Sequence, residues 1–146
     1  MGRGRRALAV FCGEIAVESK GEADILDITG EVDGVIRGSG IRNGIATISV
    51  IGATGAVTTM EYEPGLLKDF PAMLERIAPK GIPYEHEKRW HDRNGHSHVR
   101  ASLLGPSITL PVRDGSLLLG TWQQVVFIEL DIRARKRRLA VHVMGE

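Results

Sequence analysis

The chain of 146 residues has a single cysteine and a net charge of only +1. Because Cys12 is alone, no disulfide forms within the chain, and a zinc site built from cysteine pairs is excluded. The small net charge gives no field that would indicate nucleic-acid binding. No apolar run approaches the roughly 20 residues needed to cross a bilayer, and no signal-peptide core is present. We therefore expect a cytoplasmic protein with neither nucleic-acid nor membrane partners.

The apolar and charged residues that are present predict one α+β domain over residues 1–146. Hydrophobic residues make up 42% of the chain and charged residues 25%, which is typical of a soluble globular protein with one core. Two mainly antiparallel sheets packed as a sandwich, with two or three short helices, fit the many short alternating runs. The expected strands are 8–18, 45–51, 55–61, 107–112, 116–119, 125–132 and 139–144, and the expected helices are 31–39, 64–78 and 97–104.

Several of these elements carry local signals. The alternation in 8–18 slips at Gly13, which predicts a bulge and places Cys12 as a small buried hydrophobe. Pro71 predicts a kink or a split in the helix over 64–78. The Asp114-Gly115 pair predicts a hairpin. The basic residues Arg3, Arg5 and Arg6 stand near the start, and a second basic run, 133–138, is interpreted as a solvated hairpin tip.

The segment from Tyr84 to Gly105 is the most informative part of the chain. It contains His86, His91, His96 and His98, which are four of the five histidines, together with Asp92 and Asn94. Such groups hold metals, move protons or bind anions. Ser97 is a plausible N-cap, which would place His98 in the first turn of a helix, where free N–H groups favour a phosphate.

His86, His98 and Asp92 are the candidate ligands of a divalent ion, Mg²⁺ or Zn²⁺, with an open position for substrate. Their spacing matches no established metal motif, and hydrogen bonding of each histidine to nearby backbone is the structural alternative. We expect His91 and His96 to be exposed and His142, in the last strand, to be a structural histidine.

Four motifs in order resemble those of the YjbQ family, whose members are described as secondary thiamine-phosphate synthase-like. They are E-Y-E-P-G-L-L-K-D, then H-x5-D-x-N-G-x-S-H-x-R-A-S-L-L-G-P-S, then P-V-x-D-G-x-L-L-L-G-T-W-Q-Q, then E-L-D before a basic turn. The resemblance implies a small α+β sandwich that assembles as a homotrimer. It also implies formation of thiamine phosphate from a pyrimidine pyrophosphate and a thiazole phosphate.

The family's polar cluster maps onto His86, Asn94 and His98, with Glu61, Gln123 and Glu129 as expected neighbours. The chain departs from the pattern at Gly52, where many relatives carry a histidine, and at Met60, where they carry asparagine. Because of the first departure, the chain lacks one histidine that a metal site built from three histidines would use.

Roles follow from the chemistry of that reaction. His86, His98 and Glu61 are the candidate catalytic residues, since they could bind an ion, hold a phosphate or move a proton. The candidate substrate-binding residues are Asn94, Ser97, Arg100, Trp122 and Gln123. Two alternatives use the same residues: a non-catalytic trimer that binds a metal or small molecule, and a metal-dependent hydrolase of a phosphorylated metabolite.

Overall fold

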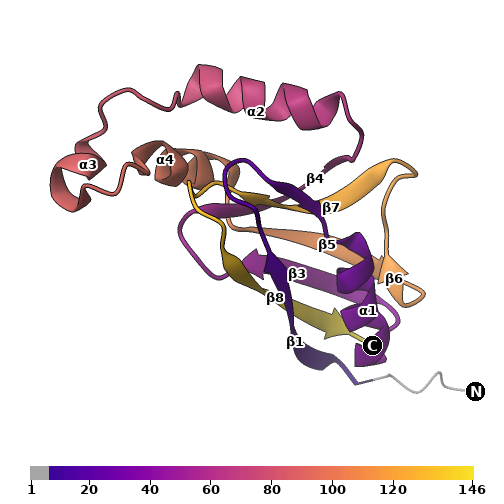
Figure 1. The fold of residues 1–146 in the computed structure, drawn as a ribbon. Helices are drawn as coiled ribbons and strands as arrows, with labels where there is room; N and C mark the ends of the chain where they lie inside the picture. The colour runs from indigo at the N-terminus through magenta and orange to yellow at the C-terminus, as the bar shows by residue number, and fades with distance from the viewer. Residues whose placement is uncertain (1–6) are drawn as a thin grey trace, which may run out of the picture.

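The computed structural model describes residues 7–146, so the basic residues Arg3, Arg5 and Arg6 lie outside it. Two antiparallel sheets form the framework (Figure 1). The larger has the strand order β1-β8-β3-β5-β6, with β1 Ala9–Glu18, β8 Lys136–Gly145, β3 Gly44–Val50, β5 Ser107–Arg113 and β6 Ser116–Leu117. The smaller has the order β2-β7-β4, with β2 Ile25–Asp27, β7 Gln123–Glu129 and β4 Gly55–Glu61. The expected α+β class with two sheets is confirmed.

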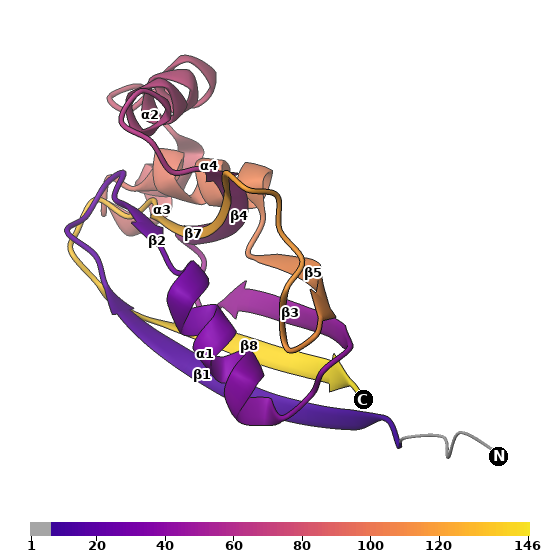
Figure 2. The same ribbon diagram turned by 90° about the vertical axis from the view of Figure 1, so that its right-hand side faces the viewer.

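Helices cover these sheets in layers. They are α1 Thr29–Ser39, α2 Leu66–Ile77, α3 Glu85–Trp90 and α4 Gly95–Leu104, which is one more than expected within the described residues. One core lies between the sheets and includes Phe127, Leu139 and Ile48. A second core lies on the other face of the smaller sheet, where α2 and α4 pack against it (Figure 2). Each fully buried aliphatic side chain in these cores contributes about 1.5–3 kcal/mol.

The bulge expected at Gly13 is absent. Strands β1 and β8 pair in unbroken register from Ala9 opposite Gly145 to Glu18 opposite Lys136. The glycine instead permits a close approach, because a Cβ at this position would stand 2.5 Å from Cγ1 of Val35 in α1. The small residue therefore lets α1 lie directly on the sheet.

Helix α2 continues through Pro71 as one helix. Its apolar stripe packs only in part: Leu74 is fully buried, four neighbours are half-buried, and Ile77 is 57% exposed. Contacts of this stripe with the second core offset the lost backbone hydrogen bond at the proline. The helix thus spans the smaller sheet while leaving apolar surface uncovered.

Cys12 and His142 lie opposite each other on the outer face of the larger sheet, and both are exposed. The expectations of a buried cysteine and a structural histidine are therefore wrong. The inward face of these strands is carried by the residues of opposite parity, such as Ile15 and Val141. Asp114 and Gly115 both have positive φ, as the predicted hairpin requires.

Candidate functional site

Four polar side chains of the 84–105 segment meet where α3 leads into α4. His86 projects from α3 and stands 3.3 Å from Asp92, measured from Nε2 to Oδ1. The rings of His86 and His98 face each other with centroids 4.4 Å apart and a tilt of 44°. Asn94, at the N-cap position of α4, is buried beside them. The structure brings these four residues together, and we call them the histidine cluster: His86, Asp92, Asn94 and His98.

Asn94 fixes the chemical state of His86. With its amide turned to satisfy its neighbours, Nδ2 donates to Asp92 Oδ1 at 2.8 Å and to His86 Nε2 at 3.1 Å. An Nε2 that accepts this bond carries no proton, so His86 is then the neutral tautomer with its hydrogen on Nδ1. The opposite amide orientation would place Oδ1 of Asn94 against both oxygens of the Asp92 carboxylate, where no hydrogen bond can form. Asn94 thus joins His86 and Asp92 in one hydrogen-bonded group.

His98 is the free member of the cluster. Its side chain is half-buried, and neither ring nitrogen has a hydrogen-bond partner among residues 7–146. His86 is held by Asp92 and Asn94, whereas His98 is held only by ring packing and its helix. An imidazole with both nitrogens unoccupied is available to bind a ligand atom or to transfer a proton.

The start of α4 differs from the expectation. The helix begins at Gly95, with Asn94 rather than Ser97 at the N-cap position. Glu87 Oε1 accepts a hydrogen bond of 2.8 Å from the Gly95 N–H, so a carboxylate of the chain already occupies this helix end. Ser97 is fully buried inside the first turn, and its Oγ has no partner in the described structure. A phosphate at the end of this helix would have to displace Glu87.

The candidate metal ligands are only partly assembled. Among the described residues, no group of three His, Cys, Asp or Glu side chains is arranged to hold a metal ion. His86, Asp92 and His98 lie in one place, but the amide of Asn94 hydrogen-bonds two of them, His86 and Asp92. An ion bound here would need oxygen atoms from a ligand to complete its coordination.

Two residues of α4 belong to a separate buried network. His96, expected to be exposed, is 2% exposed, and its Nε2 lies 2.7 Å from Oε1 of Glu22. Arg100 is equally buried and bonds Glu22, Glu75 and the Ala78 carbonyl. The guanidinium that was a candidate phosphate ligand therefore ties α4 to the end of α2. His91 is exposed, as expected.

A pocket of about 310 Å³ adjoins this network and shares Glu87 with the start of α4. Its walls are the connection between α2 and α3 and the side chain of His96. The lining residues are Lys80, Gly81, Ile82, Pro83, Tyr84, Glu87, Arg93 and His96. Desolvation, the largest influence, raises the pKa of Tyr84, whose hydroxyl donates to the Pro79 carbonyl. The pocket thus combines an apolar wall with two cationic side chains.

The other predicted neighbours lie elsewhere. Glu61 pairs with Gln123 at one end of the smaller sheet, whereas Glu129 pairs with Gly55 at the opposite end. Helix α2 starts beside the Glu61 end and runs away from it toward α3 (Figure 1). Glu61 and Trp122 are exposed, and both ends of the Gln123 amide are bonded, to Thr59 and to the Gly120 N–H. One chain does not bring these residues to the histidine cluster.

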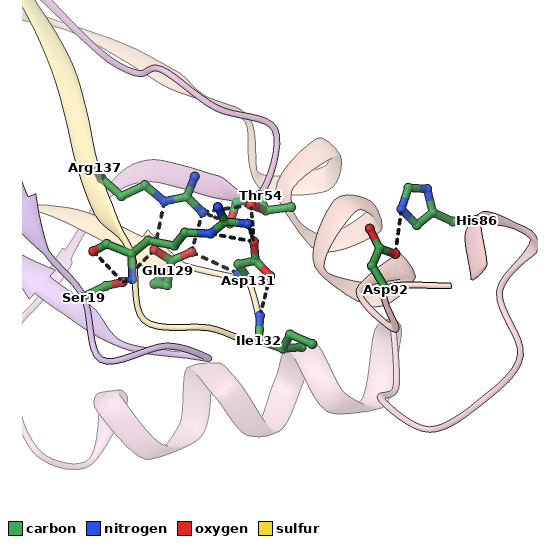
Figure 3. Close-up of polar contacts among 9 residues, drawn as sticks. Ser19, Thr54, His86, Asp92, Glu129, Asp131, Ile132 and Arg137 are labelled. Atoms are coloured by element: carbon green, nitrogen blue, oxygen red, sulfur yellow. Dashed lines mark hydrogen bonds and ion pairs between the residues drawn. The ribbon is translucent and has the colours of Figure 1, made fainter. Parts of the chain in front are cut away.

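A buried ion network forms at the Glu129 end of the sheet (Figure 3). Glu129 is fully buried and accepts bonds from Ser19, from the Asp131 N–H and from two nitrogens of Arg137. The hydrogen bond to Glu129 raises the pKa of Arg137. The expectation of a solvated hairpin tip is therefore wrong, since Arg137 is only 8% exposed and the flanking strands β7 and β8 lie in different sheets.

Asp131 is the second carboxylate of this network. It pairs with Arg135 and accepts a hydrogen bond from Thr54 Oγ1. Burial is the largest single influence and raises the pKa of Asp131, but the bonds from Arg135, the Ile132 N–H and Thr54 together outweigh it and lower that pKa. Figure 3 shows this network and the His86–Asp92 pair as two separate groups of polar side chains.

Comparison with known proteins assigns nearly the whole chain to one group. Residues 13–146 match the family described as UPF0047 protein YjbQ-like. A UPF0047 protein of Methanothermobacter thermautotrophicus is 42% identical over 139 residues, covering 95% of each chain. The Bacillus subtilis UPF0047 protein YugU is 33% identical, covering 84% of this chain and 90% of that one.

Solved structures agree with this assignment. A YbjQ-like protein of unknown function from Sulfolobus solfataricus superposes with a TM-score of 0.91 and 33% identity, covering 96% of this chain and all of that one. A hypothetical protein from Aeropyrum pernix gives a TM-score of 0.86 with 32% identity, covering 93% and 99%. Within residues 7–146, no helix has both the length and the apolar character needed to span a bilayer.

Proposed function

The chain belongs to the YjbQ-like UPF0047 family, and we propose that it acts on a phosphorylated small molecule through the histidine cluster. The observation that carries this proposal is His98, a half-buried imidazole with both nitrogens unoccupied, which packs at a tilt against His86, the imidazole that Asp92 and Asn94 hold in place. The ring nitrogens of His98 are not among the buried unsatisfied atoms, so they are open to solvent and to a ligand, whereas the nearby His96 is committed to Glu22.

The reaction we propose is the formation of thiamine phosphate. The thiazole nitrogen attacks the methylene carbon of the pyrimidine pyrophosphate, the carbon–oxygen bond breaks, and pyrophosphate leaves. The protein's contribution would be positioning and charge stabilisation rather than covalent chemistry. His98 would donate a hydrogen bond to a phosphate oxygen. His86, which Asp92 and Asn94 hold in place, would pack behind the His98 ring and keep it oriented.

A divalent ion would enter with the pyrophosphate in this scheme. Mg²⁺ is usually bound by a few protein groups together with substrate phosphates and water. Asp92 and the two histidines offer such a partial set, and the ligand would supply the remaining oxygens. The pocket lined by Tyr84, Ile82 and Pro83 offers an apolar wall for a planar ring.

We also propose that the protein works in the cytoplasm as a homotrimer whose sites span neighbouring subunits. One cross-strand row on the outer face of the larger sheet, Val10, Met144 and Ile45, is apolar and 64%, 40% and 39% exposed, respectively. Such a row supports burial against another copy. Trp122, 73% exposed beside Glu61 and Gln123, would then reach the histidine cluster of a neighbouring subunit.

A non-catalytic binding protein is the second candidate, favoured by the amide of Asn94, which holds His86 in a hydrogen-bonded state without any ligand. A turnover assay separates the two. Purified protein is incubated with the pyrimidine pyrophosphate, the thiazole phosphate and Mg²⁺, and thiamine phosphate is measured. We expect His98→Ala to lower the rate about 100-fold or more, in the range of a lost acid–base or positioning group.

The matched control is His91→Asn. It removes an exposed imidazole from the same segment, and asparagine tolerates the positive φ of 56° at that position. The control should keep the wild-type rate. Ligand binding by a folded wild type without any turnover would favour the non-catalytic candidate, and a His98→Ala rate equal to wild type would remove His98 from the mechanism.

A further inference from the structure

Arg137 presents one nitrogen that the protein does not use. The side chain is 8% exposed, and it is fixed on two sides: Nε donates to Glu129 at 2.9 Å, and Nη2 donates to Glu129 and to Thr54 Oγ1. The remaining nitrogen, Nη1, has no hydrogen-bond partner among residues 7–146. A guanidinium held this firmly has little freedom to turn Nη1 elsewhere.

Gly52 leaves that nitrogen uncovered. A Cβ at position 52 would stand 2.8 Å from Nη1, closer than real Cβ contacts, so a side chain there would cover the guanidinium edge or push it aside. Gly52 and Ala53 are exposed, and their N–H groups have no acceptor in the described structure. A fixed cationic donor therefore stands beside a short turn with two free backbone donors.

We propose that this place, the Arg137–Gly52 site, binds an oxyanion, with a phosphate group as the chemical class. Donors from a guanidinium and successive backbone amides are the combination that holds phosphates in proteins. Since Glu129 neutralises much of the charge on Arg137, recognition comes from directed hydrogen bonds rather than from a strong field. The binding of an oxyanion here does not depend on the proposed function. Only the further step, that this oxyanion is a phosphate group of the reacting ligand, rests on it.

The phosphate donors expected at α4 are already bonded to carboxylates of the chain, whereas the donor at the Arg137–Gly52 site is not. Glu87 already supplies the anion at the start of that helix, and Arg100 is committed to two carboxylates. Neither of these expected phosphate ligands is free. The nitrogen beside Gly52, in contrast, could donate a hydrogen bond to an oxyanion without breaking any contact that the protein makes.

Inorganic phosphate and pyrophosphate are the probes, and the readout is binding rather than turnover. Both are titrated into ¹⁵N-labelled protein while the guanidinium resonances of Arg137 are followed. Gly52→Ala adds one methyl group beside Nη1 and should weaken binding about tenfold or more, as expected for a lost hydrogen bond to a charged group. Gly34→Ala, whose Cβ meets nothing within 4 Å, is the control for glycine replacement and should bind like wild type.

The wild-type titration tests the proposal even if Gly52→Ala fails to fold. A shift of the Arg137 signals with added phosphate supports it. Absence of any shift overturns it, as does a folded Gly52→Ala that binds as tightly as wild type. Phosphate binding at Arg137 in a protein that makes no thiamine phosphate would sustain the oxyanion site and refute the transferase, so the two failures are distinguishable.

Discussion

Replacing Arg137 with methionine removes the only cation bonded to Glu129 within the described residues. Methionine retains much of the aliphatic volume, so the change isolates the ion pair from the packing. Glu129 is fully buried and would keep only the bonds from Ser19 and the Asp131 N–H. Breaking a buried pair from one side costs about 3–5 kcal/mol, because an uncompensated charge remains in the interior.

The comparison variant is Arg135→Met in the same network. Asp131 is 1% exposed, but Arg135 is 45% exposed, so water reaches this pair and replaces part of the lost interaction; Arg135→Met should therefore cost clearly less than Arg137→Met. Urea unfolding followed by circular dichroism, at one fixed protein concentration, measures both. With a slope of about 1–3 kcal/mol per molar urea, the midpoint of Arg137→Met should fall by about 2 M.

The double variant Glu129→Gln/Arg137→Met tests whether the unpaired charge of Glu129 causes the loss of stability. Neutralising the carboxylate should recover part of the lost stability, because the penalty comes from the orphaned charge rather than from the missing side chain. If Arg137→Met lost no more stability than Arg135→Met, the buried pair would not hold this end of the sheet together and the reasoning would be refuted.

Three further outcomes are expected. The pKa of Asp131 is lowered in the folded state, so the ionised carboxylate stabilises the fold above the unfolded pKa of about 3.9, and this stabilisation is lost as the pH falls below that value. The free energy of unfolding of Asp131→Asn should therefore decline less than that of wild type between about pH 4 and pH 2. Gly13→Ala should cost about 1–3 kcal/mol through its clash with Val35, and Val35→Ala should relieve part of that cost; an additive double variant would contradict the contact. The variants His98→Ala and Glu61→Gln are mixed in equal amounts, unfolded and refolded together. About one quarter of the wild-type turnover should return if each site takes one residue from each of two subunits, and none if each site lies within one subunit.

Much of the local structure could be predicted because its signals are local. The strand Gly55–Glu61 follows from alternation and flanking glycines, and helix α1 ends where Gly40 adopts a left-handed conformation. The grouping of His86 with Asn94 and His98 was predictable because the family motif and a short connection place them within one loop and the turns beside it.

The buried networks depend on long-range pairing and could not be predicted in the same way. His96 is buried because Glu22, 74 residues earlier, reaches it, and nothing in the spacing of the histidines distinguishes it from His98. The positions of Glu61 and Glu129 follow from antiparallel pairing, which places the ends of β4 and β7 opposite each other.

One missed residue did leave a signal. Arg137 has the same parity as Leu139, Val141 and Val143, all of which face the core of the larger sheet. Alternation through β8 therefore indicates an inward-facing arginine, which needs a buried carboxylate such as Glu129. The same parity, applied to β1, places Cys12 on the outer face.

The formation of thiamine phosphate by the wild type and by His98→Ala, measured side by side with Mg²⁺ present, tests the central claim most directly. The account predicts product from the wild type, a loss of about 100-fold or more in the variant, and an unchanged fold by circular dichroism. Equal rates in the two proteins, or no product from a folded wild type, would contradict it.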